Sequence, residues 1–221
     1  MKRLAPFPGF PGAEQRAQRT HWDALSRAIV FQQLAGKAAS TIHGRVCALT
    51  EGAHFPRCAE FLALDDRALR GAGLSRNKVL ALRDLAQRIE DGRLALQRLS
   101  RVDDDTIIER LVEVRGIGEW SAQMFLLFRL GRLDVGAAGD LGVQEGLRIL
   151  DAAPERPTAR EALARMEVWR PLRSVGCWAM WRLVDEERAA LAARTTKQAP
   201  RRSKPVTNLR QSSTKPARRR P

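Results

Sequence analysis

The chain has 221 residues, enough for one domain or for two small helical lobes. Hydrophobic residues make up 44% of the sequence and charged residues 29%, so a packed core is feasible and a wholly disordered chain is excluded. The longest interior apolar run, residues 124–128, is far shorter than the roughly 18 residues of a membrane-spanning helix, and the Pro- and Gly-rich start shows no secretory signal. We therefore expect a cytoplasmic protein with no membrane partner, or a nuclear one if the source is eukaryotic.

The net charge of +14 is unevenly spread along the chain. Residues 192–221 carry ten Lys or Arg and no Asp or Glu, which leaves +4 for residues 1–191. A strongly basic segment indicates a polyanionic partner, nucleic acid above all. A solvated basic tail without a dedicated partner explains this composition about equally well.

The cysteines and histidines form no metal-binding pattern. Cys47, Cys58 and Cys177 contain no CxxC motif, and the three histidines contain no HxxxH or HExxH motif. An odd number of widely spaced cysteines argues against a disulfide framework, a zinc ribbon or an iron–sulfur cluster. We expect reduced cysteines, no metal and no cofactor.

Apolar residues recur at helical spacing along most of the chain. The predicted helices, in chain order, include residues 22–30, 38–49, 65–70, 75–89, 104–111, 140–150, 158–166 and 171–181. Asp65, Ser75 and Asp104 are expected N-caps, Thr158 opens a capping box, and Pro171 is expected as the first residue of the last helix. Alternating strand patterns are absent, so the predicted fold class is all-α.

The two ends of the chain differ in composition from the centre. Residues 1–18 contain three prolines and are expected to form an irregular lead-in. Residues 194–221 contain too few apolar residues to offset the entropy of ordering, so we expect a disordered basic tail. Residues 19–193 form the predicted domain.

The segment 114–122, Val-Arg-Gly-Ile-Gly-Glu-Trp-Ser-Ala, joins two predicted helices by a sharp turn. Gly116 and Gly118 can adopt backbone angles that other residues avoid, and they let a partner approach the backbone closely. The helix that follows presents unpaired N–H groups, which suit a DNA phosphate. On its own, a Gly-x-Gly turn is more often a tight connection between two helices.

Asp140 lies 22 residues beyond Gly118, in the segment Gly-Asp-Leu-Gly-Val. By itself this aspartate is best explained as the N-cap of the next helix. The hairpin followed by an aspartate at this distance resembles the helix-hairpin-helix DNA glycosylases that have a Gly/Pro-rich loop and an invariant aspartate. The resemblance is strongest to the 3-methyladenine DNA glycosylase II group.

Three further segments resemble motifs of that group in the same order. They are the helix pair 28–45, which begins Ala-Ile-Val-Phe-Gln-Gln-Leu, the Gly-Leu-Ser-Arg-Asn-Lys element at 73–78, and Trp-Arg-Pro-Leu-Arg-Ser at 169–174 followed by Trp181. The resemblance therefore covers about residues 20–185. One departure is the loop 134–139, which lacks the proline that is usual before the aspartate.

The resemblance implies two helical lobes around a DNA-binding cleft, with the helix-hairpin-helix motif at about 107–130. It implies a base excision repair enzyme, acting as a monomer, that flips an alkylated purine such as 3-methyladenine out of double-stranded DNA and excises it. Asp140 would be the catalytic residue, because a carboxylate stabilises the oxocarbenium-like sugar that forms when the N-glycosidic bond breaks.

The resemblance also assigns the residues that would contact the base. Trp120 and Trp181 would face it, and a cation–π contact with an alkylated base contributes roughly 0.5–2 kcal/mol. Met124 and Leu141 would lie in the same pocket, at positions where relatives carry aromatic residues. The remaining tryptophans, Trp22, Trp169 and Trp178, are expected in the core.

Leu34 matches the apolar wedge that fills the gap left by a flipped base, although a buried core leucine is the rival interpretation. The other expected DNA contacts are Gln33, Lys37, Arg45, Gly116, Gly118 and Ser121. Exposed basic residues on a helix are often only solvated, which is the alternative for Lys37 and Arg45.

The absence of a lysine in the hairpin bears on the mechanism. Glycosylases that also cut the strand use a lysine amine to form a Schiff base. Trp120 occupies the position of that lysine here, so base removal that leaves an abasic site is favoured. A glycosylase for uracil or oxidised purine and a non-catalytic helix-hairpin-helix DNA-binding protein are the alternatives.

Overall fold

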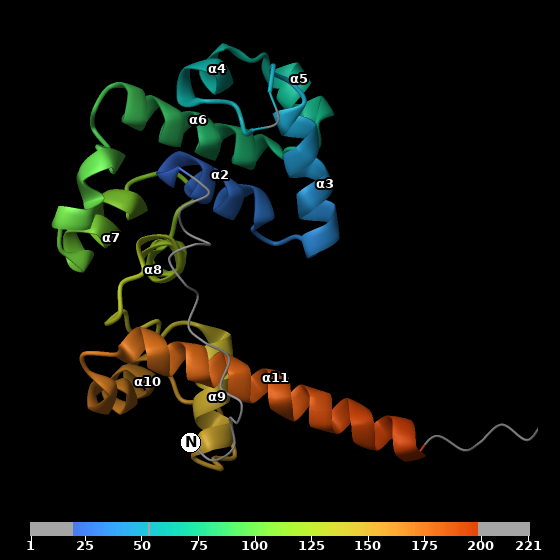
Figure 1. Ribbon diagram of the computed structural model, residues 1–221, viewed down its shortest axis with the longest axis vertical. Helices are drawn as coiled ribbons and strands as arrows, with labels where there is room; N and C mark the ends of the chain where they lie inside the picture. Colours follow the sequence, from blue (N-terminus) through green and yellow to red (C-terminus); the bar gives the residue numbers. More distant parts are fainter. Residues whose placement is uncertain (1–19, 53, 199–221) are drawn as a thin grey trace, which may run out of the picture. The chain divides into compact units, whose positions relative to one another are not determined.

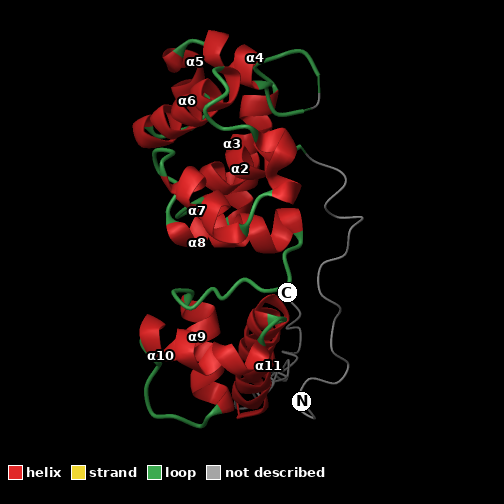
Figure 2. Cartoon of the chain, turned by 90° about the vertical axis from the view of Figure 1, so that its left-hand side faces the viewer, coloured by secondary structure: helices red, strands yellow, loops and turns green. Residues whose placement is uncertain are grey.

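The computed structural model describes residues 20–52 and 54–198, and it places them in helices joined by short loops (Figure 1). The helices are α2 (His21–Phe31), α3 (Gly36–Cys47), α4 (Cys58–Ala63), α5 (Asp66–Gly71), α6 (Arg76–Glu90), the 3-10 helix η1 (Leu96–Arg101), α7 (Asp104–Val112), α8 (Glu119–Met124), the π-helix η2 (Phe125–Leu130), α9 (Leu141–Leu150), α10 (Ala159–Met166), the 3-10 helix η3 (Glu167–Trp169) and α11 (Arg173–Gln198). No strand occurs in these two ranges (Figure 2). The all-α prediction is confirmed.

The expected caps of two helices are in place. The Ser75 hydroxyl accepts a hydrogen bond from the backbone N–H of Lys78 at the start of α6. Thr158 and Glu161 form the reciprocal capping box of α10. Asp65 is at the N-cap position of α5, but its side chain makes no capping hydrogen bond.

Two predicted helix starts are wrong. The N-cap of α7 is Asp103, whose carboxylate accepts from Thr106 N at 2.8 Å, because the neighbouring Asp104 carboxylate pairs with Arg132 at 3.0 Å. Pro171 precedes α11 and lies in a turn closed by a 2.7 Å hydrogen bond from Leu172 N to Trp169 O. The pairing of Asp104 with Arg132 is a tertiary contact, which local helix propensity does not reveal.

The buried residues of the first helices surround α6, which packs against both α2 and α4. Trp22 of α2 is in this core as predicted, where its ring meets Phe55 and Phe61 edge-on. Its indole N–H donates to Pro56 O at 2.7 Å, so the buried polar atom is satisfied. Among the described residues, no helix is long and apolar enough to cross a membrane.

A second group of helices, α9, α10 and the beginning of α11, follows along the chain (Figure 2). Helix α9 crosses α11 at Gly146, where a Cβ atom would lie 2.7 Å from the backbone oxygen of Met180. Only glycine permits so close an approach of the two backbones. The position of α9 against α11 matters because each helix carries one residue of the site described below.

The described residues up to Glu186 belong to one compact unit, and those from Glu187 belong to a second. Helix α11 continues to Gln198, so residues 194–198 of the expected tail are helical. The expected lead-in, 1–18, and the rest of the expected tail, 199–221, lie outside the described residues.

Candidate active site

Asp140 is the N-cap of α9, and its side chain is 9% exposed. Oδ1 accepts from the backbone N–H of Val143 at 2.8 Å and from Trp181 Nε1 at 2.7 Å. Oδ2 accepts from Trp120 Nε1 at 2.6 Å. None of the three donors carries a charge, so the hydrogen bonds orient the carboxylate without neutralising it.

The cap interpretation of Asp140 is therefore correct, and it does not exclude a catalytic role. The backbone of α9 fixes one oxygen, while the hairpin and α11 each hold the carboxylate through an indole. A group fixed in this way loses little freedom when charge develops opposite it, which is the requirement for electrostatic catalysis.

The proline-free loop before Asp140 is anchored by hydrogen bonds. The buried Ser174 hydroxyl accepts from Val135 N at 3.0 Å and donates to Arg132 O at 2.7 Å. Farther along the loop, the Gln144 side-chain amide donates to Ala138 O at 2.9 Å. These contacts restrain the loop near both of its ends.

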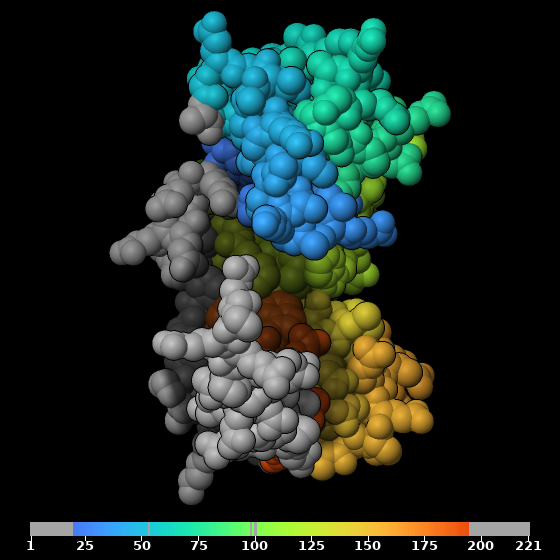
Figure 3. Space-filling view, turned by 90° about the vertical axis from the view of Figure 1, so that its right-hand side faces the viewer, coloured from blue at the N-terminus to red at the C-terminus, as the bar shows by residue number. Residues whose placement is uncertain are grey.

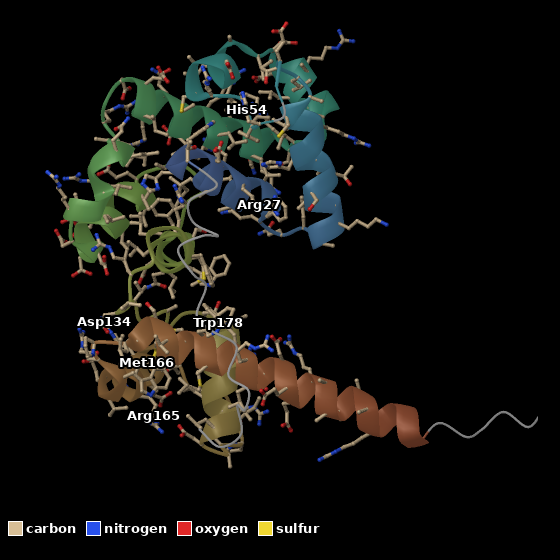
Figure 4. The ribbon with its side chains drawn as sticks, viewed as in Figure 1. Arg27, His54, Asp134, Arg165, Met166 and Trp178 are labelled. Carbon is tan, nitrogen blue, oxygen red and sulfur yellow. The ribbon has the colours of Figure 1, made fainter. Side chains whose placement is uncertain are left out.

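An ion pair adds to this anchor at the start of α11. Arg173 Nε lies 2.8 Å from Asp134 Oδ1, and its guanidinium also donates to the backbone oxygen of Asp134 at 2.8 Å. Hydrogen bonding by Arg173 lowers the pKa of Asp134 below its usual value. Figure 4 labels Asp134 beside the first turn of α11, the helix that also carries Trp181.

An aromatic cluster lies beside the carboxylate. The Trp181 ring stacks on Phe128 with centroids 5.6 Å apart, and Trp178, which Figure 4 labels, meets both rings edge-on at 6.4 Å. The prediction that Trp178 belongs to the core is therefore wrong, because its half-buried ring packs on Trp181 and Phe128. Trp169 is partly buried against the core, as expected.

Sequence reasoning missed Phe128. It belongs to the apolar run 124–128, which a regular α-helix would divide between two faces. The π-helical turns of η2 change that register, and Phe128 is 38% exposed beside Trp181. The length of the apolar run predicted that its residues would be buried, but it did not predict the π-helical change of register that exposes Phe128.

A cavity of about 770 Å³ lies between α2 and the segment α8–η2. Its lining residues are Ala24, Arg27, Ala28, Phe31, Gln32, Gln33, Gly116, Trp120, Ser121, Met124, Phe125, Phe128 and Arg129. Trp120 is 49% exposed at this cavity, and Met124 is half-buried. Among the described residues, Trp181 and Leu141 do not line the cavity, and Leu141 is 64% exposed.

Two arginines of this cavity were not predicted. The Arg27 guanidinium lies 3.7 Å from the centre of the Phe31 ring (Figure 4), and Arg129 Nε donates to His21 Nδ1 at 3.1 Å. Burial, with a smaller effect of the Arg129 charge, lowers the pKa of His21. Helical periodicity assigns such residues to solvent, so only the packing of α2 against η2 places them here.

The hairpin runs from α7 to α8 through Gly116, whose φ is +77°, and Gly118, the N-cap of α8. The Gln32 side-chain amide donates to Gly116 O at 3.0 Å and approaches Ser121 Oγ at 3.4 Å. The end of α2 is thus attached directly to the hairpin.

The expected wedge and phosphate contacts lie on one exposed segment. Leu34 is 39% exposed in the loop between α2 and α3, which rules out the buried-core alternative. Gln33 before it, and Lys37 and Arg45 on α3, are also exposed. Figure 3 shows this segment, in blue, at the surface. In the described part of the chain, no group of three or more His, Cys, Asp or Glu side chains could hold a metal ion.

An all-helical chain with a Gly-Ile-Gly hairpin, an aspartate held at the next helix start and an aromatic cavity beside it has the organisation of a helix-hairpin-helix DNA repair glycosylase. Residues 26–171 match the family model described as HhH-GPD superfamily base excision DNA repair protein. The chain belongs to this superfamily.

Its relatives point to one branch of the superfamily. DNA-3-methyladenine glycosylase 1 of Schizosaccharomyces pombe is 33% identical over 183 residues, which cover 82% of this chain and 80% of that protein. DNA-3-methyladenine glycosylase of Saccharomyces cerevisiae is 36% identical, over 59% of this chain and 47% of that protein.

Solved structures similar to this chain include 3-methyladenine glycosylases. The S. pombe 3-methyladenine DNA glycosylase in complex with abasic DNA has a TM-score of 0.72 and 31% identity, covering 82% of this chain and 89% of that one. A DNA-3-methyladenine glycosidase from Bacillus halodurans has a TM-score of 0.71 and 36% identity, covering 79% and 78%.

Proposed function

We propose that this chain is a monofunctional DNA glycosylase that excises alkylated purines such as 3-methyladenine from duplex DNA and leaves an abasic site. The observation that carries the proposal is the Asp140 carboxylate, held by three neutral N–H donors, with Trp120 shared between that carboxylate and the cavity. Capping of α9 needs only the hydrogen bond from Val143 N, so it does not explain the two indole donors on the same carboxylate, and a carboxylate beside anionic phosphates opposes DNA binding.

The chemistry follows from the charge of the lesion. A purine nucleotide alkylated at a ring nitrogen, such as 3-methyladenine in DNA, is cationic. When the glycosidic bond breaks, the bonding electron pair goes to the base, which leaves as a neutral molecule. The positive charge then resides on the sugar, where Asp140 stabilises it until water adds to the anomeric carbon and gives up its proton to the Asp140 carboxylate or to solvent. A general acid for the leaving group is not required.

Trp120 connects base recognition with this chemistry. Its indole N–H donates to Asp140 while its ring lines the cavity, so a base stacked on the ring would present its glycosidic bond close to the carboxylate. An electron-deficient cationic base is attracted to an aromatic face more strongly than a normal base. This difference would favour alkylated purines.

The lysines of the described body do not support a Schiff-base mechanism. The Lys78 amine donates to two backbone oxygens at 2.7 and 2.9 Å, and Lys37 is exposed on α3. A nucleophilic lysine must be near the reacting sugar and able to lose its proton. Excision without strand cleavage fits these positions better.

One observation favours a second candidate, a glycosylase for a neutral base such as uracil or an oxidised purine. Arg27 and Arg129 line the cavity. Guanidinium N–H groups donate to carbonyl oxygens of bases and oppose entry of a cationic base. The aromatic lining favours the first candidate, because a neutral base gains less from it.

Base release from three duplexes distinguishes these functions. Matched duplexes would contain 3-methyladenine, uracil or 8-oxoguanine, and free base would be measured under single-turnover conditions. We expect release from the methylated duplex. Release confined to uracil or 8-oxoguanine would establish the second candidate, and binding without release from any duplex would establish a DNA-binding protein.

A further inference from the structure

Lys78 in the first turn of α6 holds the end of α2. Its amine donates to Val30 O at 2.7 Å and to Gln32 O at 2.9 Å. The last carbonyl groups of a helix lack partners within the helix and form the negative end of its dipole, so a cation there is stabilising. Burial lowers the pKa of Lys78, so the amine has exchanged part of its hydration for these two bonds.

Gln32 accepts the Lys78 hydrogen bond with its backbone oxygen, and its side chain bonds to the hairpin. The side-chain amide donates to Gly116 O at 3.0 Å, in the turn between α7 and α8. One residue therefore joins three parts of the molecule that are distant in sequence: α6, the end of α2 and the hairpin.

The residues after Gln32 have the geometry that needs such support. Gln33 has a φ of +56°, a region that residues other than glycine rarely occupy and that persists only where the surroundings impose it. Leu34 follows directly and is 39% exposed. The hydrogen bonds of Lys78 and Gln32 lie next to this strained position.

We propose that Lys78 and Gln32 are positioning residues for base flipping, which set the direction of Leu34 relative to the hairpin. The inference rests on the proposed function. A side chain that enters a base stack must arrive at one step of the duplex while the hairpin holds the backbone nearby. A fixed link between the wedge loop and the hairpin makes the two arrive together.

A simpler role would be to stabilise α2 and nothing else. That role lowers every activity of the protein in proportion to the folded fraction. A positioning role has a different consequence. It lowers excision only from DNA in which Leu34 must enter the base stack, and its effect disappears when Leu34 is removed. Both consequences can be measured.

The experiment compares single-turnover excision of the same methylated base in a fully paired duplex and in a three-nucleotide bubble, where little unpairing remains to be done. The variants are Lys78→Met, Gln32→Leu, Leu34→Ala and the double variant Lys78→Met/Leu34→Ala. Arg76→Met, an exposed charge in the same turn of α6, is the matched control.

We expect Lys78→Met, Gln32→Leu and Leu34→Ala each to lose about 10- to 100-fold in excision rate on the paired duplex, the size of effect produced by a small misplacement. On the bubble the loss is expected to be at least several-fold smaller. The double variant is expected to be no slower than Leu34→Ala alone, because residues that act through one another are not additive. Arg76→Met is expected to behave as the parent protein.

Equal losses on both substrates, or additive losses in the double variant, would overturn the inference. If Lys78→Met does not fold, as judged by circular dichroism, the same comparison of paired and bubble DNA is made with two other single variants, Gln32→Leu and Lys78→Arg. The arginine retains a cation at the carbonyl groups. A parent protein that releases no base from either DNA would instead refute the proposed function.

Discussion

Trp181 Nε1 donates to Oδ1 of Asp140 at 2.7 Å, across 41 residues of sequence. The ring belongs to α11, and the carboxylate is the N-cap of α9. The contact orients the carboxylate, and the base-facing role that the resemblance implies for Trp181 stays a prediction. One face of its ring stacks on Phe128, with centroids 5.6 Å apart.

Replacing Asp140 by Asn should remove most base excision. The amide cannot stabilise a positive sugar, and one of its two ends would present N–H groups to an indole donor. Loss of an electrostatic stabiliser of this kind costs about 100-fold or more in rate. Single-turnover base release, with circular dichroism and duplex binding as checks of folding, tests this. A folded variant with near-normal excision would remove Asp140 from the mechanism.

Trp181→Phe keeps an aromatic ring but removes the N–H donor to Asp140. A hydrogen bond to a charged group contributes about 1.5–3 kcal/mol, so we expect excision to fall by about 10- to 100-fold. Trp178→Phe is the matched control, since that half-buried ring packs edge-on against Trp181 and its replacement leaves the Trp181 N–H donor to Asp140 in place. Equal rates for the two variants would show that the ring, and not the N–H, matters.

The product of the reaction should be an intact strand with an abasic site. The hairpin segment 114–122 contains no lysine, and the Lys78 amine is bound to backbone oxygens. We expect strand breaks only after later treatment with alkali or heat, on a sequencing gel. A covalent protein–DNA adduct trapped by borohydride requires a reactive amine and would contradict this prediction.

Gly146→Ala should destabilise the protein. The added Cβ would lie 2.7 Å from the backbone oxygen of Met180, and overpacking of this kind costs roughly 1–3 kcal/mol in the free energy of unfolding. Gly44→Ala, at a position in α3 with no atom within 4 Å, is the matched control and should stabilise by about 0.5–1 kcal/mol. Urea unfolding measures both. A Gly146→Ala variant as stable as the parent protein, or more stable, would contradict the close packing of α9 on α11.

Deleting residues 199–221 should weaken nonspecific duplex binding. This segment carries eight Lys or Arg and no Asp or Glu. Each phosphate that it neutralises contributes about 0.9 to the slope of log K against log salt, so the slope should become shallower. Single-turnover excision at saturating protein should change little, because Asp140 and Trp120 are in the body. If the affinity for duplex DNA and the salt slope did not change, the segment would have no part in DNA binding.

The sequence by itself determined the all-α class, several helix starts and the positions of the hairpin and the aspartate. The caps at Ser75 and Thr158 were predictable because a capping side chain bonds to a backbone group three residues away. The hairpin and Asp140 were recognisable because their residue types and spacing occur together in one chain segment.

Only the tertiary structure decided what surrounds these residues. Trp120 and Trp181 are bound to the carboxylate, Phe128 lies against Trp181, and Lys78 holds the end of α2. Each of these contacts joins residues on different helices and depends on how the helices cross and on a π-helical change of register. Periodicity and capping describe neighbours within a few residues, so they carry no information about contacts that packing alone creates.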